Sequence, residues 1–339
     1  MPSVGFQQGQ FEDEGRPNWD GNGPRPIRYC VWYPAEDGSP GGLMDIGPPE
    51  APLFHMGEIA PDAPLAEAIN PYPVVLLSHG TGGNAEGIGW LGCRLAARGY
   101  VAIAVSHHGN TVAEPYRAEG FLCWWERAPD LVLALDHAAE QRAFAEQLNK
   151  GRVYSAGFSL GAYTVMALLG ARTDTNLFRT WYDRHGDRLG KGPREFPDLT
   201  DRIDDLLKDS PVFRESWDRA GDDYQDNRIH AALALSPAPT VRGFTEDSLA
   251  AITRPVTIIC GRDDKEAPHD LCAAWLNDTL SNSNLLLLGE TVGHYVFLNE
   301  ALPAGIAEMP DICVDAEGVN RHAIHNQAAL MADFLFSAN

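Results

Sequence analysis

Solid apolar runs separated by amphipathic segments constrain the fold of this chain more than any other feature. Residues 72–78 and 100–105 are almost wholly apolar and rich in β-branched side chains, which is typical of strands buried on both faces of a parallel sheet. Apolar residues at helical spacing follow each run, at 88–98 and 128–148. The alternation predicts an α/β fold in which helices cover both faces of a mostly parallel central sheet.

The same patterns place further elements along the 339 residues. We expect strands at 4–11, 26–33, 152–156, 229–235, 255–260 and 285–288, and helices at 162–169 and 321–336. The length favours one domain over 1–339 that carries an insertion.

Two stretches interrupt this alternation. Residues 35–72 are rich in Gly, Pro and Ala, and we expect a loop over the surface. Residues 171–228 are dense in Asp, Arg and Gly, with one helix expected at 200–209. Two interpretations of this insertion stay open, a solvated excursion and a cap over an active site.

Charge and hydropathy exclude several classes of protein. The chain has 26 Lys and Arg against 47 Asp and Glu, a net charge of −21, which repels phosphate backbones and argues against nucleic-acid binding. No apolar run approaches a membrane span. The N-terminus has no signal-peptide pattern, so we expect a cytoplasmic protein. Of the six cysteines, Cys272 and Cys313 lie in polar surroundings and are the candidates for a disulfide.

The pentapeptide Gly157-Phe-Ser-Leu-Gly161 matches the pattern G-x-S-x-G. It lies between an expected strand and an expected helix, where a nucleophile elbow exposes a serine hydroxyl on a strained turn. The glycines leave room for the chain to pass itself, and the helix that follows directs partial positive charge at a developing oxyanion. We therefore predict Ser159 as a nucleophile.

A serine nucleophile needs a histidine base and a carboxylate that orients it. In this architecture they follow in the order Ser, Asp or Glu, His, in loops after later strands. Asp264 and His294 meet that order. Asp263 also follows the strand at 255–260, but neighbouring residues in an extended loop point to opposite sides, so one carboxylate reaches the imidazole.

The remaining histidines and acids predict no metal site. His322 and His325 lie three residues apart on the last helix and lack the spacing of a helical zinc pair. His107, His108 and His137 show no acidic constellation in the sequence. We expect no metal and no cofactor.

The oxyanion needs two backbone N–H donors. We expect one from Leu160, next to the nucleophile, and one from Thr81 in the glycine-rich turn 79–84. Trp124, Trp125 and Phe158 are candidates for the lining of a substrate pocket, although adjacent tryptophans point in different directions and at least one is expected in the core.

At this point the sequence resembles the α/β-hydrolase superfamily, and within it a bacterial group of predicted dienelactone hydrolases related to platelet-activating-factor acetylhydrolases. The resemblance rests on short motifs, namely Val31-Trp-Tyr-Pro34, Ser78-His-Gly80, His108-Gly-Asn110, Arg127-Ala-Pro-Asp130, the elbow, Gly261 to Pro268, Gly293-His-Tyr-Val-Phe297, and Cys313 with Arg321 and His325. It implies a single α/β-hydrolase domain, a Ser159–His294–Asp264 triad with the acid at Asp264, and no cofactor. Dienelactone hydrolases use a cysteine nucleophile where this chain has Ser159, so the resemblance fixes no substrate.

The sequence thus predicts a serine esterase. Its substrate would be a small to medium carboxylic ester, a lactone or a short-acyl lipid, cleaved through an acyl-enzyme on Ser159. Two alternatives remain, an amidase or peptidase on the same triad and a catalytically silent binding protein of the same fold. The oligomeric state is left open.

Overall fold

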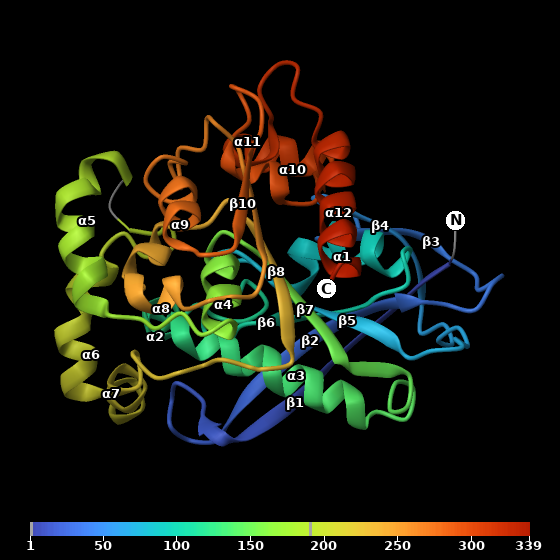
Figure 1. Cartoon of the computed structure of the whole chain (residues 1–339), viewed down its shortest axis with the longest axis horizontal. Coiled ribbons are helices and arrows are strands. Elements are labelled where there is room, and N and C mark those ends of the chain that lie inside the picture. The colour runs from blue at the N-terminus through green and yellow to red at the C-terminus, as the bar shows by residue number, and fades with distance from the viewer. Residues whose placement is uncertain (1–2, 190–191) are drawn as a thin grey trace.

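The computed structural model describes residues 3–189 and 192–339, which form one central sheet flanked by helices (Figure 1). The strands are β1 (Val4–Pro17), β2 (Pro24–Pro34), β3 (Gly42–Ile46), β4 (Phe54–Pro61), β5 (Tyr72–Ser78), β6 (Val101–Ser106), β7 (Leu148–Phe158), β8 (Ile229–Leu235), β9 (Val256–Cys260), β10 (Ser283–Leu287) and β11 (Glu300–Ala301). Their order across the sheet is β10-β9-β8-β7-β5-β6-β2-β1-β4-β11, and β3 pairs with β4.

The half of the sheet that carries the candidate site is parallel. All neighbours from β6 through β5, β7, β8 and β9 to β10 pair in parallel, whereas β2 is antiparallel to β6 and β1 is antiparallel to β2. The carboxyl ends of the parallel strands therefore meet at one edge, where ligands of open α/β sheets bind. This confirms the predicted α/β fold.

Helices cover both faces of the sheet. They are α1 (Gly89–Ala96), α2 (Ala118–Leu122), α3 (Arg127–Glu140), α4 (Leu160–Leu168), α5 (Thr175–Leu189), α6 (Ile203–Asp209), α7 (Pro211–Asp218), α8 (Glu246–Ala250), α9 (Ala273–Thr279), α10 (Pro303–Glu308), α11 (Pro310–Cys313) and α12 (Arg321–Ser337). In the described ranges, no helix is long and apolar enough to cross a membrane.

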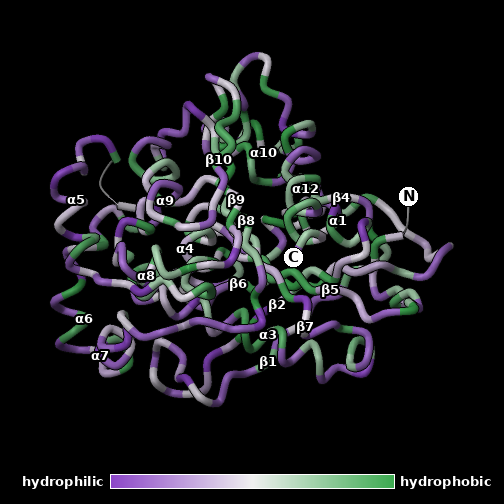
Figure 2. The backbone as a smooth tube through the Cα atoms, in the orientation of Figure 1, coloured by the Kyte–Doolittle hydropathy of each residue, from purple (hydrophilic) through white to green (hydrophobic). Residues whose placement is uncertain are grey.

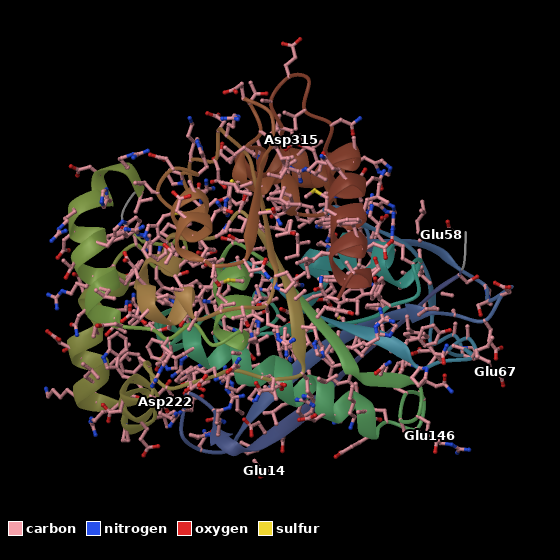
Figure 3. All side chains as sticks on the ribbon, viewed as in Figure 1. Glu14, Glu58, Glu67, Glu146, Asp222 and Asp315 are labelled. Atoms are coloured by element: carbon pink, nitrogen blue, oxygen red, sulfur yellow. The ribbon has the colours of Figure 1, made fainter. Side chains whose placement is uncertain are left out.

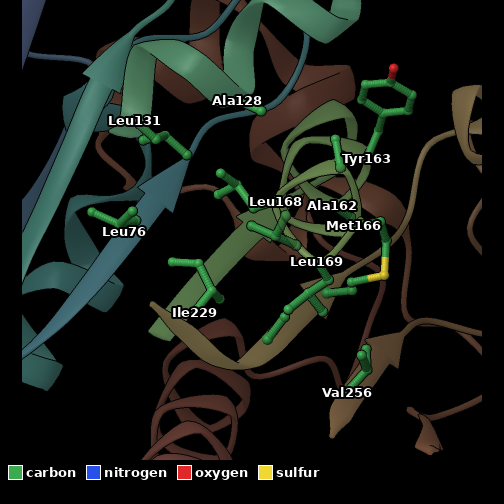
Figure 4. Packing of buried hydrophobic residues seen from close by; sticks show 14 of the residues in the cluster. Leu76, Ala128, Leu131, Ala162, Tyr163, Met166, Leu168, Leu169, Ile229 and Val256 are labelled. Carbon is green, nitrogen blue, oxygen red and sulfur yellow. The ribbon is translucent and has the colours of Figure 1, made fainter. Parts of the chain in front are cut away.

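Alternate residues of each central strand feed two separate cores. In β5, Val74 and Leu76 pack with α3, α4 and α9, while Val75 and Leu77 pack with α1 and α12 on the opposite face. Figure 4 shows the first core, where Leu76 and Leu131 converge with residues of α4. Burial on both faces explains why these strands read as continuous apolar runs.

The apolar interior contrasts with an acidic exterior. Figure 2 shows hydrophobic residues concentrated along the central strands and hydrophilic residues along much of the outer chain. Carboxylates from distant parts of the sequence, among them Glu14, Glu67, Glu146 and Asp222, lie around the periphery in Figure 3. The net charge of −21 is thus spread over the surface.

Two expectations about local structure were wrong. The stretch 35–72 is not all loop, because it contains β3 and β4, and β4 pairs with β1, β3 and β11. These strands depend on distant partners that local composition does not reveal. The helix expected over 128–148 ends at Glu140, because Gln141 turns extended and Phe144 folds back into the core.

The insertion 171–228 is more helical than predicted. The helix expected at 200–209 is present as α6 after a 3₁₀ turn at Leu199–Arg202, and α5 and α7 accompany it. Its residues 190 and 191 lie outside the described residues. Apolar side chains of the insertion, including Leu199 and Phe213, pack against Phe121 and Trp125 of the main domain.

The cysteines form no disulfide. All six are free and buried, including Cys272 at the start of α9 and Cys313 at the end of α11. Cys272 and Cys313, the candidates for a disulfide, are therefore not paired.

Candidate active site

Ser159 lies on a strained turn between β7 and α4. Its backbone has φ 55° and ψ −115°, a conformation that is costly for a residue with a side chain. The flanking glycines are required by close approach. A Cβ on Gly157 would lie 2.0 Å from the carbonyl oxygen of Gly161, and a Cβ on Gly161 would lie 1.9 Å from that of Ser78. The G-x-S-x-G pattern thus follows from packing around the turn.

The structure brings Ser159, His294 and Asp264 together. His294 Nε2 lies 3.0 Å from Ser159 Oγ, and His294 Nδ1 lies 2.8 Å from Asp264 Oδ2. All three side chains are buried, and the Phe158 ring packs 4.9 Å from the imidazole. Because a carboxylate accepts, Nδ1 carries the proton and Nε2 is free to accept one from the serine hydroxyl.

Asp264, and not Asp263, faces the imidazole. The second oxygen of Asp264 accepts from the backbone N–H of Ala267 at 2.7 Å, while Asp263 is half-exposed and pairs with Lys265. Gly261 allows this loop to meet the loop of His294, because a Cβ there would lie 2.0 Å from the carbonyl oxygen of Val292. The geometry agrees with the residue that the resemblance indicated.

The residues expected to supply the oxyanion donors are Leu160, which follows Ser159 in the chain, and Thr81, which lines the same cavity. Leu160 is the first residue of α4, so its N–H is one of the donors that a helix leaves without an internal partner. Thr81 lines the same cavity as Ser159. The N–H groups of Gly82 and Gly83 already donate to Asn110 Oδ1 and Gly80 O, which leaves Thr81 as the candidate of these three.

A cavity of about 1470 Å³ contains these groups. Trp124 and Phe158 line it, as predicted, but Trp125 does not. Trp125 is fully buried and donates its indole N–H to the carbonyl oxygen of Ser216, 2.9 Å away on α7. It therefore joins the insertion to the main domain and belongs to the core.

The insertion contributes a large part of the cavity lining. Side chains from α5, from the segment 192–201 and from α6 line it, as do parts of β3, β4 and the segment 308–312. Sequence reasoning left open a cap role for the insertion without naming any of its residues, and it did not identify β3, β4 or the segment 308–312 as part of the site. The signal that existed was position, since the insertion follows the elbow helix.

His107 contradicts the expectation that no acid surrounds it. Its Nδ1 lies 2.9 Å from Asp130 Oδ2 and its Nε2 lies 3.0 Å from Ser78 Oγ. Asp130 also accepts from Arg16 Nη2 at 2.6 Å and Arg25 Nε at 3.0 Å. The sequence concealed this buried cluster because its members come from β1, β2, β5, α3 and the loop after β6.

His108, His322 and His325 have local structural roles. His108 Nδ1 lies 2.6 Å from Glu114 Oε1, so it too has an acidic neighbour. His325 is fully buried, stacks on Trp90 at 3.9 Å and donates from Nε2 to the carbonyl oxygen of Val296. His322 is exposed beside Glu300. In the part of the chain that the structure describes, no group of His, Cys, Asp and Glu could hold a metal ion.

With this geometry in view, comparison with known proteins identifies the class. A family model described as "Alpha/beta hydrolase family" matches residues 74–309, and the chain belongs to that family. The match spans the elbow serine, the acid loop and the histidine.

A solved structure, a ferulic acid esterase from Streptomyces cinnamoneus, resembles the chain with a TM-score of 0.65 over 99% of this chain and 90% of that one. The two are 17% identical in sequence, so the likeness shows the fold. Among curated proteins, none matches the chain. The narrower resemblance to the dienelactone hydrolase group stays a prediction.

Proposed function

We propose that this protein is a serine hydrolase that cleaves carboxylic esters through an acyl-enzyme on Ser159. One observation carries the proposal: an unbroken hydrogen-bonded chain from Ser159 through His294 to Asp264 at the wall of a large cavity. A silent binding protein has no need to keep a strained serine in register with a base and an acid.

The geometry supports a two-step mechanism. Ser159 Oγ attacks the ester carbonyl carbon while His294 Nε2 takes the hydroxyl proton, and the carbonyl oxygen becomes an oxyanion facing the N–H groups of Thr81 and Leu160. The C–O bond to the alcohol then breaks, and His294 donates the proton to the departing oxygen. Water attacks the acyl-enzyme with His294 again as base, which releases the acid and restores the serine.

Asp264 acts through His294. Its carboxylate accepts from Nδ1–H, which fixes the ring tautomer and stabilises the imidazolium that forms in each step. The proton remains on the imidazole and is not transferred to Asp264.

The volume of the cavity and the charges of its lining favour an uncharged substrate. Its volume exceeds the roughly 300–1,000 Å³ of an ordinary small-molecule site, which favours an ester with a bulky apolar part. The described lining carries more carboxylates than guanidinium groups, namely Asp183, Glu195, Asp201, Asp204, Glu266 and Glu308 against Arg179 and Arg194. We infer that an ester bearing a carboxylate is a poorer substrate than its neutral counterpart.

A fluorophosphonate probe and a series of p-nitrophenyl esters test the proposal. We expect covalent labelling of the wild-type protein at Ser159, located by peptide mass spectrometry, and hydrolysis of esters over a range of acyl lengths. Ser159→Ala should show neither. A wild-type protein that takes no label and hydrolyses no ester would overturn the proposed function.

The charge preference has its own matched pair of substrates. The mono-p-nitrophenyl ester of adipate carries a carboxylate, and the ester of a branched alkyl acid of the same shape does not. We expect kcat/KM to favour the neutral ester by about tenfold at low salt and by less at high salt, since salt screens the interaction. Equal values, or a preference for the adipate ester, would show that the carboxylates of the lining do not govern selection.

A further inference from the structure

The direction of the Thr81 N–H is fixed by its neighbour. The N–H of Thr81 and the C=O of Gly80 belong to one planar trans peptide, so they point in opposite directions. Gly80 O accepts from His79 Nδ1 at 2.6 Å and from the N–H of Gly83 at 3.3 Å. Groups that hold Gly80 O therefore also aim the Thr81 N–H.

His79 is itself held from three sides. Its Nδ1 must carry the proton, because Gly80 O can only accept. Its Nε2 accepts from the backbone N–H of His107 at 3.1 Å, and its own carbonyl oxygen accepts from Arg127 Nη2. The turn that presents Thr81 is therefore anchored through His79 to α3 and to the strand end at β6.

Burial of the Arg127 guanidinium at this position has a large desolvation cost. Arg127 is fully buried at the start of α3, and within the described residues its Nε and Nη1 have no hydrogen-bond partner. Burial lowers its pKa to about 9, which leaves it protonated near neutral pH. Its hydrogen bonds go from Nη2 to His79 O and to Ser78 Oγ, the latter at 3.3 Å. A buried cation that bonds chiefly to a backbone carbonyl has few partners to offset its desolvation penalty.

We propose that Arg127 is a positioning residue for the oxyanion turn. Its guanidinium anchors the carbonyl of His79, and His79 in turn orients the Gly80–Thr81 peptide so that its N–H faces Ser159. The buried set Ser78, His107 and Asp130 keeps this arrangement rigid, because His107 bonds both Ser78 and Asp130. The inference rests on the proposed function, since it assigns a role in stabilising the oxyanion.

Arg25 provides a matched control. It is also buried and bonds Asp130 through Nε at 3.0 Å and Nη2 at 3.2 Å. The described structure records no hydrogen bond from Arg25 to the turn at 79–83. Arg127→Met and Arg25→Met therefore each remove a buried cation that interacts with Asp130, but only the first releases His79.

The experiment measures kcat, KM, the inhibition constant of a trifluoromethyl ketone and the unfolding midpoint for both variants. The ketone forms a tetrahedral adduct with an oxyanion, so its affinity reports the donors directly. For Arg127→Met we expect kcat and ketone affinity to fall together, on the order of tenfold to a hundredfold, with KM within about threefold of wild type. For Arg25→Met we expect a lower unfolding midpoint with kcat within about threefold.

Arg127→Lys keeps the buried charge and carries the test if Arg127→Met does not fold. Lysine is a point charge without the planar fork of arginine, so we expect its kcat to lie between those of Arg127→Met and wild type. Folded Arg127 variants with wild-type kcat and ketone affinity would overturn the inference and leave the esterase proposal intact. Equal loss of kcat in the Arg25 variant would also overturn it. A wild-type protein without hydrolysis or labelling would overturn both proposals.

Discussion

Two Ser–His–Asp sets among the described residues have almost the same hydrogen-bond distances. At the cavity, Ser159 Oγ lies 3.0 Å from His294 Nε2, and His294 Nδ1 lies 2.8 Å from Asp264. Below the oxyanion turn, Ser78 Oγ lies 3.0 Å from His107 Nε2, and His107 Nδ1 lies 2.9 Å from Asp130. Distances alone cannot distinguish a reactive set from a structural one.

The surroundings separate the two sets. Ser78 is fully buried at the end of a regular strand, while Ser159 sits on the strained elbow and lines the cavity. Burial and the nearby Arg127 lower the pKa of His107 to about 3, so it is a poor base near neutral pH.

The two carboxylates differ in the same way. Burial alone would raise the pKa of Asp130, but Arg25 and Arg16 hold it well below its usual value. The negative charge of Asp130 is thus stabilised mainly by Arg25 and Arg16. Among the described residues, Asp264 has no ion-pair partner besides His294. We therefore propose that the Ser159 set is the reactive one, because its serine lines the cavity and its acid has the histidine as its ion-pair partner.

Replacing each serine in turn tests this contrast most severely. Ser159→Ala should reduce kcat/KM by about 10⁴-fold or more, because no nucleophile remains. Ser78→Ala should reduce it by at most about tenfold, since that hydroxyl does not meet substrate. Steady-state kinetics on one p-nitrophenyl ester measure both. Comparable losses in two folded variants would erase the distinction between the sets.

Replacing the acids sharpens the assignment of the reactive set. Asp264→Asn should cost about 10⁴-fold in kcat/KM, because the amide favours the wrong imidazole tautomer. Asp263→Asn should cost less than about tenfold, since Asp263 is half-exposed and pairs with Lys265. The circular dichroism spectra of both proteins serve as the folding control. The reverse order of losses would move the acid role to Asp263.

The buried set of Ser78, His107 and Asp130 should affect how the free energy of unfolding depends on pH. His107 is neutral when folded, with a pKa near 3, whereas an unfolded histidine has a pKa of about 6.5. Its contribution is therefore complete above about pH 6.5 and is lost as the pH falls toward 3. By linkage, His107 alone should lower the free energy of unfolding by about 2 kcal/mol between pH 7 and pH 5.

Urea unfolding at a series of pH values measures this effect. His107→Gln should flatten the acid side of the curve, and the exposed His322→Gln should leave it close to that of wild type. His79 remains in both proteins, and burial lowers its pKa as well, so part of the acid loss should persist. An unchanged slope in His107→Gln would show that His107 is not buried in its neutral form.

The smallest expected effect is that of a chelator. Neither set has a metal ion as a partner in the proposed mechanism, and the described residues contain no cluster suited to one. Prolonged dialysis against EDTA should leave kcat/KM unchanged within error. Activity that disappears with EDTA and returns with a divalent ion would contradict the mechanism for the reactive set.

The sequence by itself determined the elements whose signals are local. Burial on both faces makes the central strands continuous apolar runs, so β5 and β8 were predicted to the residue. The elbow was recognisable because close approach at Gly157 and Gly161 excludes every other residue type. The order of serine, acid and histidine follows from the strand order, which fixed Ser159 and His294 as candidates.

Tertiary structure decided what depends on distant partners. The strands β3 and β4 form by pairing across the sheet edge, and the lining from 192–201 exists because the insertion packs on Phe121 and Trp125. The second Ser–His–Asp set joins three elements whose sequences carry no shared pattern. The local sequence indicates the secondary structure and burial of a residue. The electrostatic role of a histidine depends instead on the charged groups that folding brings beside it. Folding therefore places Asp264 beside the imidazole of His294 and Asp130 beside the guanidinium groups of Arg16 and Arg25.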